Sequence, residues 1–361
     1  MRVALIGVGQ AGGKVTEALV EYDYNNEFDA VRSALAVNTA QADLQSLRID
    51  TMLVGEERVK GHGVGADNEL GAEIMETDAN VVLEALQARV TAEVDALFVV
   101  AGLGGGTGSG GAPVLVRELK RVYDVPVYAL GILPGRGEGS IYQVNAGRSL
   151  KTLIREADAT LLVDNDAWHE SGESVVEAFD EINKAIAQRV GLFLAAGENV
   201  EGVAESVVDS SEVINTLREG GIAALGYSSA VAAADASENV NTVMSATREA
   251  LYTGTSLPDA TEADAALLVI AGRPDAIPRK GVERARSWLE EELGSMQIRG
   301  GDFPLESDRI AAVVLLAGVE GSGRVQEFFD RAKEAKEQAE NRRQQQDPEE
   351  AFQSEELDDL F

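Results

Sequence analysis

The chain has 361 residues, 45% of them hydrophobic, and its 62 acidic against 31 basic residues give a net charge of -31. This length suggests two domains, and the acidic excess repels nucleic acid, so we expect no nucleic-acid partner. No apolar run approaches the ~20 residues of a membrane span, and the absence of cysteine excludes disulfides and thiolate metal sites.

The first half of the chain alternates strand and helix patterns. The run RVALIGVG predicts a buried strand from Arg2, followed by a helix over residues 11–21. Because this strand leaves no room for a signal peptide, we expect a cytoplasmic protein. Further strands are predicted at SALAVNT, ALFVVAGL, VPVYALGIL and ATLLVDND. With helices between most of them, the pattern predicts an α/β fold with a doubly wound parallel sheet over residues 1–172.

A long helix is predicted next, over residues 173–197. Its apolar residues recur at spacings of three and four, which indicates one continuous buried stripe. The stripe comprises Val175, Phe179, Ile182, Ile186, Val190 and Phe193. A helix of this length suggests a rod that joins two domains.

The second half predicts a smaller, mixed α/β domain over residues 198–325. Helices are expected near 239–252 and over 280–294. The predicted strands are GIAALGYSSAV, AALLVIAG, SMQIRGG and RIAAVVLLAGV. Residues 326–361 form an acidic tail without an apolar stripe, which we expect to be solvated helix or disordered.

The first glycine loop, GVGQAG at residues 7–12, follows a strand and precedes a helix, where backbone N–H groups can approach a phosphate. A dinucleotide-binding enzyme also needs an acidic residue at the end of the second strand, and this strand ends on Asn38. A P-loop would need glycine at Val8 and a hydroxyl at Val15. The NAD interpretation is therefore weak, and the P-loop interpretation fails.

A second glycine loop, GLGGGTGSGG at residues 102–111, can turn successive N–H groups towards one anion. Thr107 and Ser109 add hydroxyl donors, and Pro113 is expected in the first turn of the following helix. The loops NTAQAD from Asn38 and KGHGVGADNELG from Lys60 are predicted to lie at the same sheet edge. Together they predict a nucleotide crevice in which backbone dipoles and a metal ion hold the phosphates.

These motifs resemble the tubulin/FtsZ family. GLGGGTGSGG is similar to the family signature, GQAGGK to the first nucleotide loop of tubulin, and NTAQAD and GHGVGADNELG to the second and third loops of FtsZ. The resemblance covers residues 1–325. It implies a GTPase domain that uses GTP or GDP and Mg²⁺, a long core helix, a second domain, and head-to-tail polymerisation with copies of itself.

The composition narrows the resemblance. Only eight of the 31 basic residues are lysine, and near 1 M salt the Debye length falls to ~3 Å, which removes most self-repulsion. An acidic chain with so little lysine is therefore expected in a salt-rich cytoplasm. Together with the motifs, this composition most resembles the CetZ group of haloarchaea, and that resemblance implies control of cell shape. A ring protein of cell division is the alternative within the family. A dinucleotide oxidoreductase and a non-polymerising nucleotide sensor are the alternatives outside it.

The resemblance also implies the nucleotide-binding residues, with Gln10 near the Mg²⁺ through water. They are Gly9, Gln10, Ala11, Gly12, Gly13, Lys14, Asn38, Asp67, Asn68, Gly104, Gly105, Gly106, Thr107, Gly108, Glu138, Asn165, Phe179 and Asn183. Phe179 and Asn183 are four apart on one helix face, so one can stack on a base while the other bonds its edge. Phe179 could instead belong to the core, and Asn165 could close a turn. Asp164 and Asp166 are expected to face solvent or cap a helix.

The catalytic candidates lie in VVDSSEVINTLREGG, residues 207–221. The resemblance implies that this loop enters the nucleotide site of the next subunit, with Glu212 as the main catalytic carboxylate and Asp209 as its helper. The alternative is a capping box that begins a helix. Val207 replaces the usual asparagine, and Tyr142 stands where bacterial FtsZ has an arginine.

The remaining expectations concern partners and metals. The ending EELDDLF could recruit a membrane adaptor or be a solvated acidic tail, and no direct membrane insertion is expected. His62 is expected to hydrogen-bond within its loop and His169 to lie on the surface. Mg²⁺ is the only expected metal.

Overall fold

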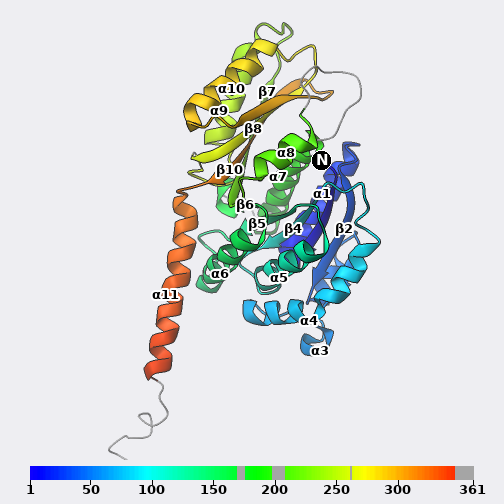
Figure 1. Ribbon diagram of the computed structural model, residues 1–361, viewed down its shortest axis with the longest axis vertical. Coiled ribbons are helices and arrows are strands. Elements are labelled where there is room, and N and C mark those ends of the chain that lie inside the picture. The colour runs from blue at the N-terminus through cyan, green and yellow to red at the C-terminus, as the bar shows by residue number, and fades with distance from the viewer. Residues whose placement is uncertain (169–174, 197–207, 261, 346–361) are drawn as a thin grey trace, which may run out of the picture.

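The structure is a computed structural model that describes residues 1–361 except 169–174, 197–207, 261 and 346–361. Its strands form one ten-stranded sheet in the order β3-β2-β1-β4-β5-β6-β7-β10-β8-β9. Helices cover both faces of this sheet (Figure 1). The prediction of a doubly wound α/β fold with a mixed second sheet is confirmed, and the two sheets are continuous.

The first six strands pair in parallel. They are β1 (Val3–Val8), β2 (Val31–Asn38), β3 (Thr51–Leu53), β4 (Ala96–Gly102), β5 (Val127–Leu133) and β6 (Thr160–Asp164). Every residue of β1, β5 and β6 is buried, as expected of parallel strands covered on both faces. The sequence pattern did not predict β3, because three residues are too few to show a period.

The remaining strands continue the sheet beyond β6. They are β7 (Ile222–Val231), β8 (Ala263–Gly272), β9 (Ile298–Pro304) and β10 (Arg309–Val319). β7 joins β6 in parallel through the pairs Thr160–Ile222 and Leu161–Ala223. β10 lies antiparallel between β7 and β8, and β9 is parallel to β8.

One face of the sheet is covered by α1 (Gly9–Asn25), α7 (Val175–Ala196) and α8 (Ser210–Leu217). The helix predicted over 173–197 is α7, and its stripe residues Ile182, Ile186, Val190 and Phe193 are buried against this face. Short helices connect the strand ends: α2 (Gln41–Gln45), α3 (Glu56–Val59) and the 3₁₀ turn η1 (Asn165–Trp168).

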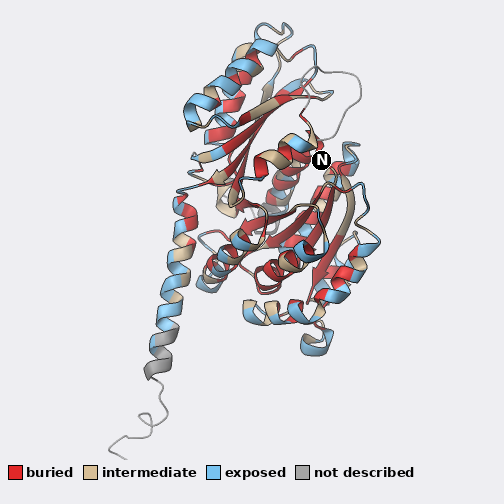
Figure 2. Ribbon diagram, viewed as in Figure 1, coloured by how far each residue is buried: buried red, intermediate tan, exposed pale blue. Residues whose placement is uncertain are grey.

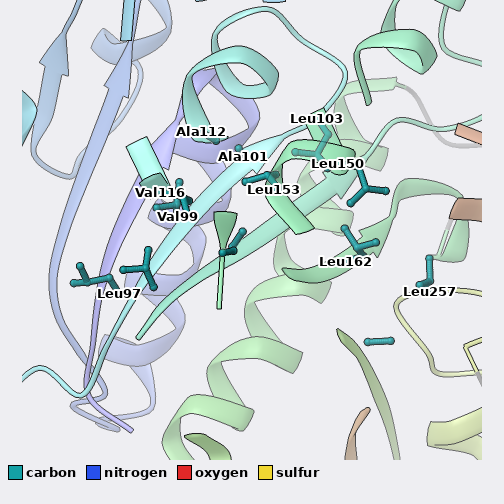
Figure 3. Close-up of a cluster of buried hydrophobic side chains, with 14 of the residues drawn as sticks. Leu97, Val99, Ala101, Leu103, Ala112, Val116, Leu150, Leu153, Leu162 and Leu257 are labelled. Carbon is teal, nitrogen blue, oxygen red and sulfur yellow. The ribbon is translucent and has the colours of Figure 1, made fainter. Parts of the chain in front are cut away.

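The other face is covered by α4 (Asn68–Gln87), α5 (Thr107–Val122), α6 (Ser140–Glu156), α9 (Asn239–Tyr252) and α10 (Arg279–Leu293). Figure 3 shows part of this core, where Val99 of β4 lies beside Val116 of α5, with Leu97 further along the strand and Leu153 on α6. Burial follows the same plan, with the sheet and the inner sides of the helices buried (Figure 2).

The last described helix, α11 (Gly323–Gln345), extends away from the body as a rod (Figure 1). Its first turns are anchored, because Val325 and Phe328 are buried in the same core as α6. The tail predicted as helix or disorder is therefore helical through Gln345, and residues 346–361 lie outside the described residues. Within the described ranges, no helix is both long and apolar enough to cross a membrane.

The expectation that Pro113 lies in the first turn of its helix is wrong. Helix α5 already begins at Thr107, so Pro113 is its seventh residue and is buried in the second turn. Glycine is a poor helix former, which placed the predicted start too late. In the fold, the backbone of α4 packs directly on this glycine-rich turn, since a Cβ atom on Gly110 would lie 2.7 Å from the amide nitrogen of Ala72. Tertiary packing thus overrides the local preference.

Candidate nucleotide-binding site

A cavity of about 440 Å³ lies where β1, β4, β5 and β6 end at one edge of the sheet. Residues from seven separate stretches of the chain line it. The predicted binding residues among them are Gly9, Gln10, Ala11, Lys14, Asn38, Gly104, Gly105, Gly106, Thr107, Gly108, Glu138, Asn165, Phe179 and Asn183. The parallel topology brings these distant loops together, because the carboxyl ends of parallel strands share an edge.

Two helix N-termini form one end of the cavity. α1 begins at Gly9 and α5 at Thr107, and neither described first turn contains an acidic residue. Gly9 has a φ of 76°, and a Cβ atom there would lie 2.8 Å from the amide nitrogen of Gly108. Unpaired N–H groups and helix dipoles favour an anion here. This end therefore suits an anion such as a phosphate in spite of the acidic composition.

The second loop is fixed to this end by side-chain hydrogen bonds. Asp43 accepts from Gln10 Nε2 and from Asn38 Nδ2, each at 3.1 Å. The hydroxyls of Thr39 and Thr107 lie 2.7 Å apart and are buried. The Asn38 side chain also accepts from the Thr39 amide at 2.8 Å. These contacts hold loops of β1, β2 and β4 in one arrangement.

Asp43 and Gln10 also provide the oxygen ligands that Mg²⁺ prefers. Mg²⁺ is usually held by one or two carboxylates together with substrate phosphates and water. The described residues contain no cluster of three or more His, Cys, Asp or Glu side chains that could hold a metal alone. A single carboxylate beside a phosphate cradle fits a Mg²⁺ ion that arrives with a nucleotide.

The other end of the cavity offers an aromatic ring and polar groups. Phe179 is 42% exposed, so it is not a core residue of the α7 stripe. Asn165 Nδ2 donates to Glu138 Oε1 at 3.3 Å, and Asn165 Oδ1 is buried without a partner among the described residues. Glu138 Oε1 also accepts from the Gly135 amide at 2.8 Å. A flat ring beside a buried acceptor without a partner among the described residues suits a nucleoside base.

Four described residues predicted to bind nucleotide do not line the cavity: Gly12, Gly13, Asp67 and Asn68. Gly13 packs beside Leu47, and Asp67 caps α4 by accepting from the Leu70 amide at 3.0 Å. The backbone of Asn68 packs on the start of α5. These residues support the loops that line the cavity.

The cavity also includes residues that the sequence did not single out for binding. Asp43, His62, Pro134 and Tyr142 all line it. Asp43 lies within NTAQAD, so its place beside Gln10 could have been inferred from the loop. Pro134 carries no polar side chain, and nothing in its type signals a site. Tyr142, which stands where bacterial FtsZ has an arginine, lies in the wall of the cavity.

Of the two roles expected of Asp164, the exposed one is wrong and the helix cap is confirmed, because Oδ1 accepts from the Asp166 amide in η1 at 3.1 Å. Its side chain is fully buried, and Oδ2 accepts from Arg324 Nε at 2.8 Å. Asp166 is only half-buried, and its Oδ2 accepts from the Arg136 amide at 2.8 Å. The partner of Asp164 lies 160 residues further along the chain, so no local pattern could have revealed the pair.

The catalytic candidates form the capping box that was the alternative interpretation. Asp209 accepts from the Glu212 amide at 2.9 Å, and Glu212 Oε2 accepts from the Asp209 amide at 3.4 Å. The Ser211 hydroxyl lowers the pKa of Asp209, while burial raises the pKa of Glu212. Val207 and His169 lie outside the described residues.

Asp209 and Glu212 are not among the described residues that line the cavity. The end of their helix, at Leu217 and Arg218, lies instead with Pro126 and Asp158, which precede β5 and β6. The seven residues of β5 span about 23 Å at ~3.3 Å each. Helix α8 therefore ends at the edge of the sheet opposite the cavity.

Comparison with known proteins agrees with this geometry. Residues 2–173 match the GTPase domain of the tubulin/FtsZ family, and residues 172–334 match the C-terminal domain of tubulin-like CetZ. The tubulin-like protein CetZ2 of Haloferax volcanii is 66% identical, with the whole of both chains covered.

Solved structures extend the comparison. The GTPγS-bound protofilament of Haloferax volcanii CetZ2 has a TM-score of 0.90, and the match covers 94% of this chain and all of that one. The GDP-bound monomer of CetZ1 from the same organism is 49% identical, with a TM-score of 0.87, over 93% of this chain and all of that one. The chain therefore belongs to the CetZ group of the tubulin/FtsZ family.

Proposed function

We propose that this chain is a cytoplasmic GTPase that binds GTP or GDP with Mg²⁺ and polymerises head to tail into a filament that controls cell shape. The observation that carries the proposal is the shape of the single cavity described above. Two helix N-termini lie at one end, and exposed Phe179 with Asn165 and Asn183 lies at the other. A guanine nucleotide matches both ends.

In the bound state, the amides at the start of α5 and α1 hold the phosphates. Phe179 stacks on the base, Asn183 and Asn165 hydrogen-bond its edge, and Glu138 receives the ribose hydroxyls. Gln10 and Asp43 are the residues that would hold Mg²⁺, which neutralises charge on the phosphates during transfer.

Hydrolysis is proposed to need a second subunit. Glu212 orients the attacking water and accepts its proton, and Asp209 assists. The burial that raises the pKa of Glu212 brings it closer to the working pH of a general base. Glu212 lies at the start of α8, two residues before Ile214, which lies with Leu217 and Arg218 near the sheet edge opposite the cavity. Because the eight residues of α8 span only about 12 Å, head-to-tail stacking would bring Glu212 towards the nucleotide of the next subunit.

Self-association is the proposed partnership, and the protofilament of the Haloferax volcanii relative supports it. The capping box does not conflict with catalysis, since each carboxylate uses one oxygen for the cap. A membrane adaptor bound by the tail remains a further candidate partner. It would bind residues that lie outside the described part of the chain.

The test is GTP turnover against protein concentration in multimolar KCl, with electron microscopy of the same samples. We expect specific activity to rise above a threshold concentration at which filaments are first seen. Full turnover in samples diluted far below that threshold would exclude the shared site. Binding of NADH in place of GTP would exclude the nucleotide assignment itself.

A further inference from the structure

Arg324 is a buried cation beside the cavity that the proposed chemistry does not use. Its side chain is 1% exposed. The guanidinium donates to Asp164 Oδ2 at 2.8 Å, to the Pro134 carbonyl at 2.7 Å and to Glu327 Oε2 at 3.0 Å. It also lies over the ring of Phe328, 4.4 Å from the centroid. The planar guanidinium group, with its five N–H donors, can bind all of these partners at once, which the single ammonium group of lysine could not do.

Two partners of Arg324 lie at or next to the base end of the cavity. Pro134 lines the cavity, and Asp164 directly precedes Asn165, which lines it as well. Asp164 Oδ1 in turn accepts from the Asp166 amide at 3.1 Å. The guanidinium thus joins the ends of β5 and β6 at the place where the proposed guanine contacts are made.

A second connection runs through α6. Helix α11 packs so closely on α6 that a Cβ atom on Gly147 would meet the Phe328 carbonyl and lie 2.8 Å from the Cβ of Ala332. Two residues earlier, Asn145 Nδ2 donates to the carbonyls of Ala66 at 2.8 Å and Gly104 at 3.0 Å. One face of α6 therefore holds loops at the phosphate end, while another receives α11.

We propose that Arg324 is a positioning residue that holds the base end of the cavity in its binding geometry through the docking of α11. The consequence is reciprocal. If docked α11 favours nucleotide binding, bound nucleotide favours docking of α11 by the same factor. The proposal rests on the proposed function, because it requires that the cavity binds a guanine nucleotide. On this proposal, the docking of α11 becomes tighter when a nucleotide occupies the cavity.

A purely structural anchor would predict a different result. Loss of the pair would then lower stability throughout the molecule and leave affinity of the folded protein unchanged. Removing Arg324 alone leaves Asp164 as an uncompensated buried charge, which is strongly destabilising. The double variant Asp164→Asn with Arg324→Gln removes both charges, so that no uncompensated charge is left buried; Asn has the shape of Asp, and Gln keeps an N–H donor on a shorter side chain.

The experiment measures fluorescent GDP binding and hydrogen exchange of full-length protein in multimolar KCl. In the wild type, saturating GDP should slow exchange in residues 323–331. In the double variant, we expect affinity to fall at least tenfold and this GDP-dependent slowing to disappear. The matched control is Asn239→Ala, which removes a fully buried side chain bonded to Ala233 and Ala276, away from the cavity. It should lower stability and keep both nucleotide readouts.

The outcomes separate the two proposals. A wild type that binds no guanine nucleotide overturns the proposed function and this inference with it. A wild type that binds GDP without any change of exchange in α11 overturns the inference alone, even where the double variant does not fold. A folded double variant with unchanged GDP affinity also overturns it.

Discussion

Asn165 donates its side-chain amide to Glu138 Oε1 at 3.3 Å, while its own Oδ1 is buried without a partner in the described part of the chain. An unsatisfied buried acceptor is costly, so this atom is best explained by a donor that arrives with a ligand. On its Watson–Crick edge guanine presents N1–H and 2-amino donors, whereas adenine has an acceptor at N1 and no 2-amino group. Under the proposed function, the Asn165 carbonyl would therefore favour guanine over adenine.

The first prediction concerns Asn165→Ala. Removing one hydrogen-bonding partner of a buried group costs ~1–3 kcal/mol, which corresponds to a roughly 5- to 150-fold weaker affinity. We expect this loss for GDP and GTP in a fluorescence titration, with ATP binding unchanged and weak. The control is Asn241→Ala, at an exposed position of α9. Equal affinity of Asn165→Ala and wild type for GTP would remove Asn165 from the site.

The second prediction compares two apolar residues of α7. Phe179 is 42% exposed and lines the cavity, whereas Ile186 is fully buried. Phe179→Ala should change the free energy of unfolding by about 0.5 kcal/mol but weaken nucleotide binding by ~1–3 kcal/mol, the usual value of stacking on a base. Ile186→Ala should destabilise by ~2–5 kcal/mol and leave the affinity of the folded protein unchanged. Chemical denaturation and GDP titration of both variants test this pair, and the opposite pattern would assign Phe179 to the core.

Local patterns predicted most of the fold. Strands such as β4 and β5 are short apolar runs bounded by turn residues, and the stripe of α7 repeats with helical spacing, so each element is visible in its own segment. The glycine loops were equally local, because backbone approach to a ligand needs glycine at neighbouring positions. Sequence therefore located the cavity and most of the residues around it.

Contacts between distant segments could not be predicted. Arg324 and Asp164 are separated by 160 positions, and a charged residue in a polar context normally indicates solvent exposure. The early start of α5 at Thr107 also depends on a distant segment, because close packing by α4 keeps the glycine-rich first turn helical. Whether Phe179 faced the core or the cavity also depended on the neighbours of α7, which its spacing does not reveal.

The third prediction concerns salt. With a net charge of -31, the folded chain repels itself, and about 2 M KCl reduces the Debye length to a few Å. We expect the melting temperature to rise steadily from about 0.2 M to about 2 M KCl. Sucrose at equal water activity is the control for general exclusion effects. A melting temperature that falls with salt would show that surface ion pairs, such as Arg58 with Glu73, outweigh the net repulsion.

The fourth prediction separates catalysis from capping at Glu212. Glu212→Gln keeps an oxygen that can accept from the Asp209 amide, so the helix start is preserved, but it removes the carboxylate that would accept a proton from water. Loss of a general base costs about 10²–10⁴-fold in rate. We expect turnover of assembled protein to fall by that factor, with GTP affinity and the melting temperature nearly unchanged.

The role of Glu212 as a general base also predicts the direction in which turnover changes with pH. The base works as the carboxylate, so wild-type turnover should decrease as pH falls through the pKa of Glu212. Burial raises that pKa, which moves the decrease above the ~4.3 of an exposed glutamate. The residual turnover of Glu212→Gln should lack this acid limb. A variant that keeps both the wild-type rate and its acid limb would show that Glu212 only caps α8, and that the water is activated by another group.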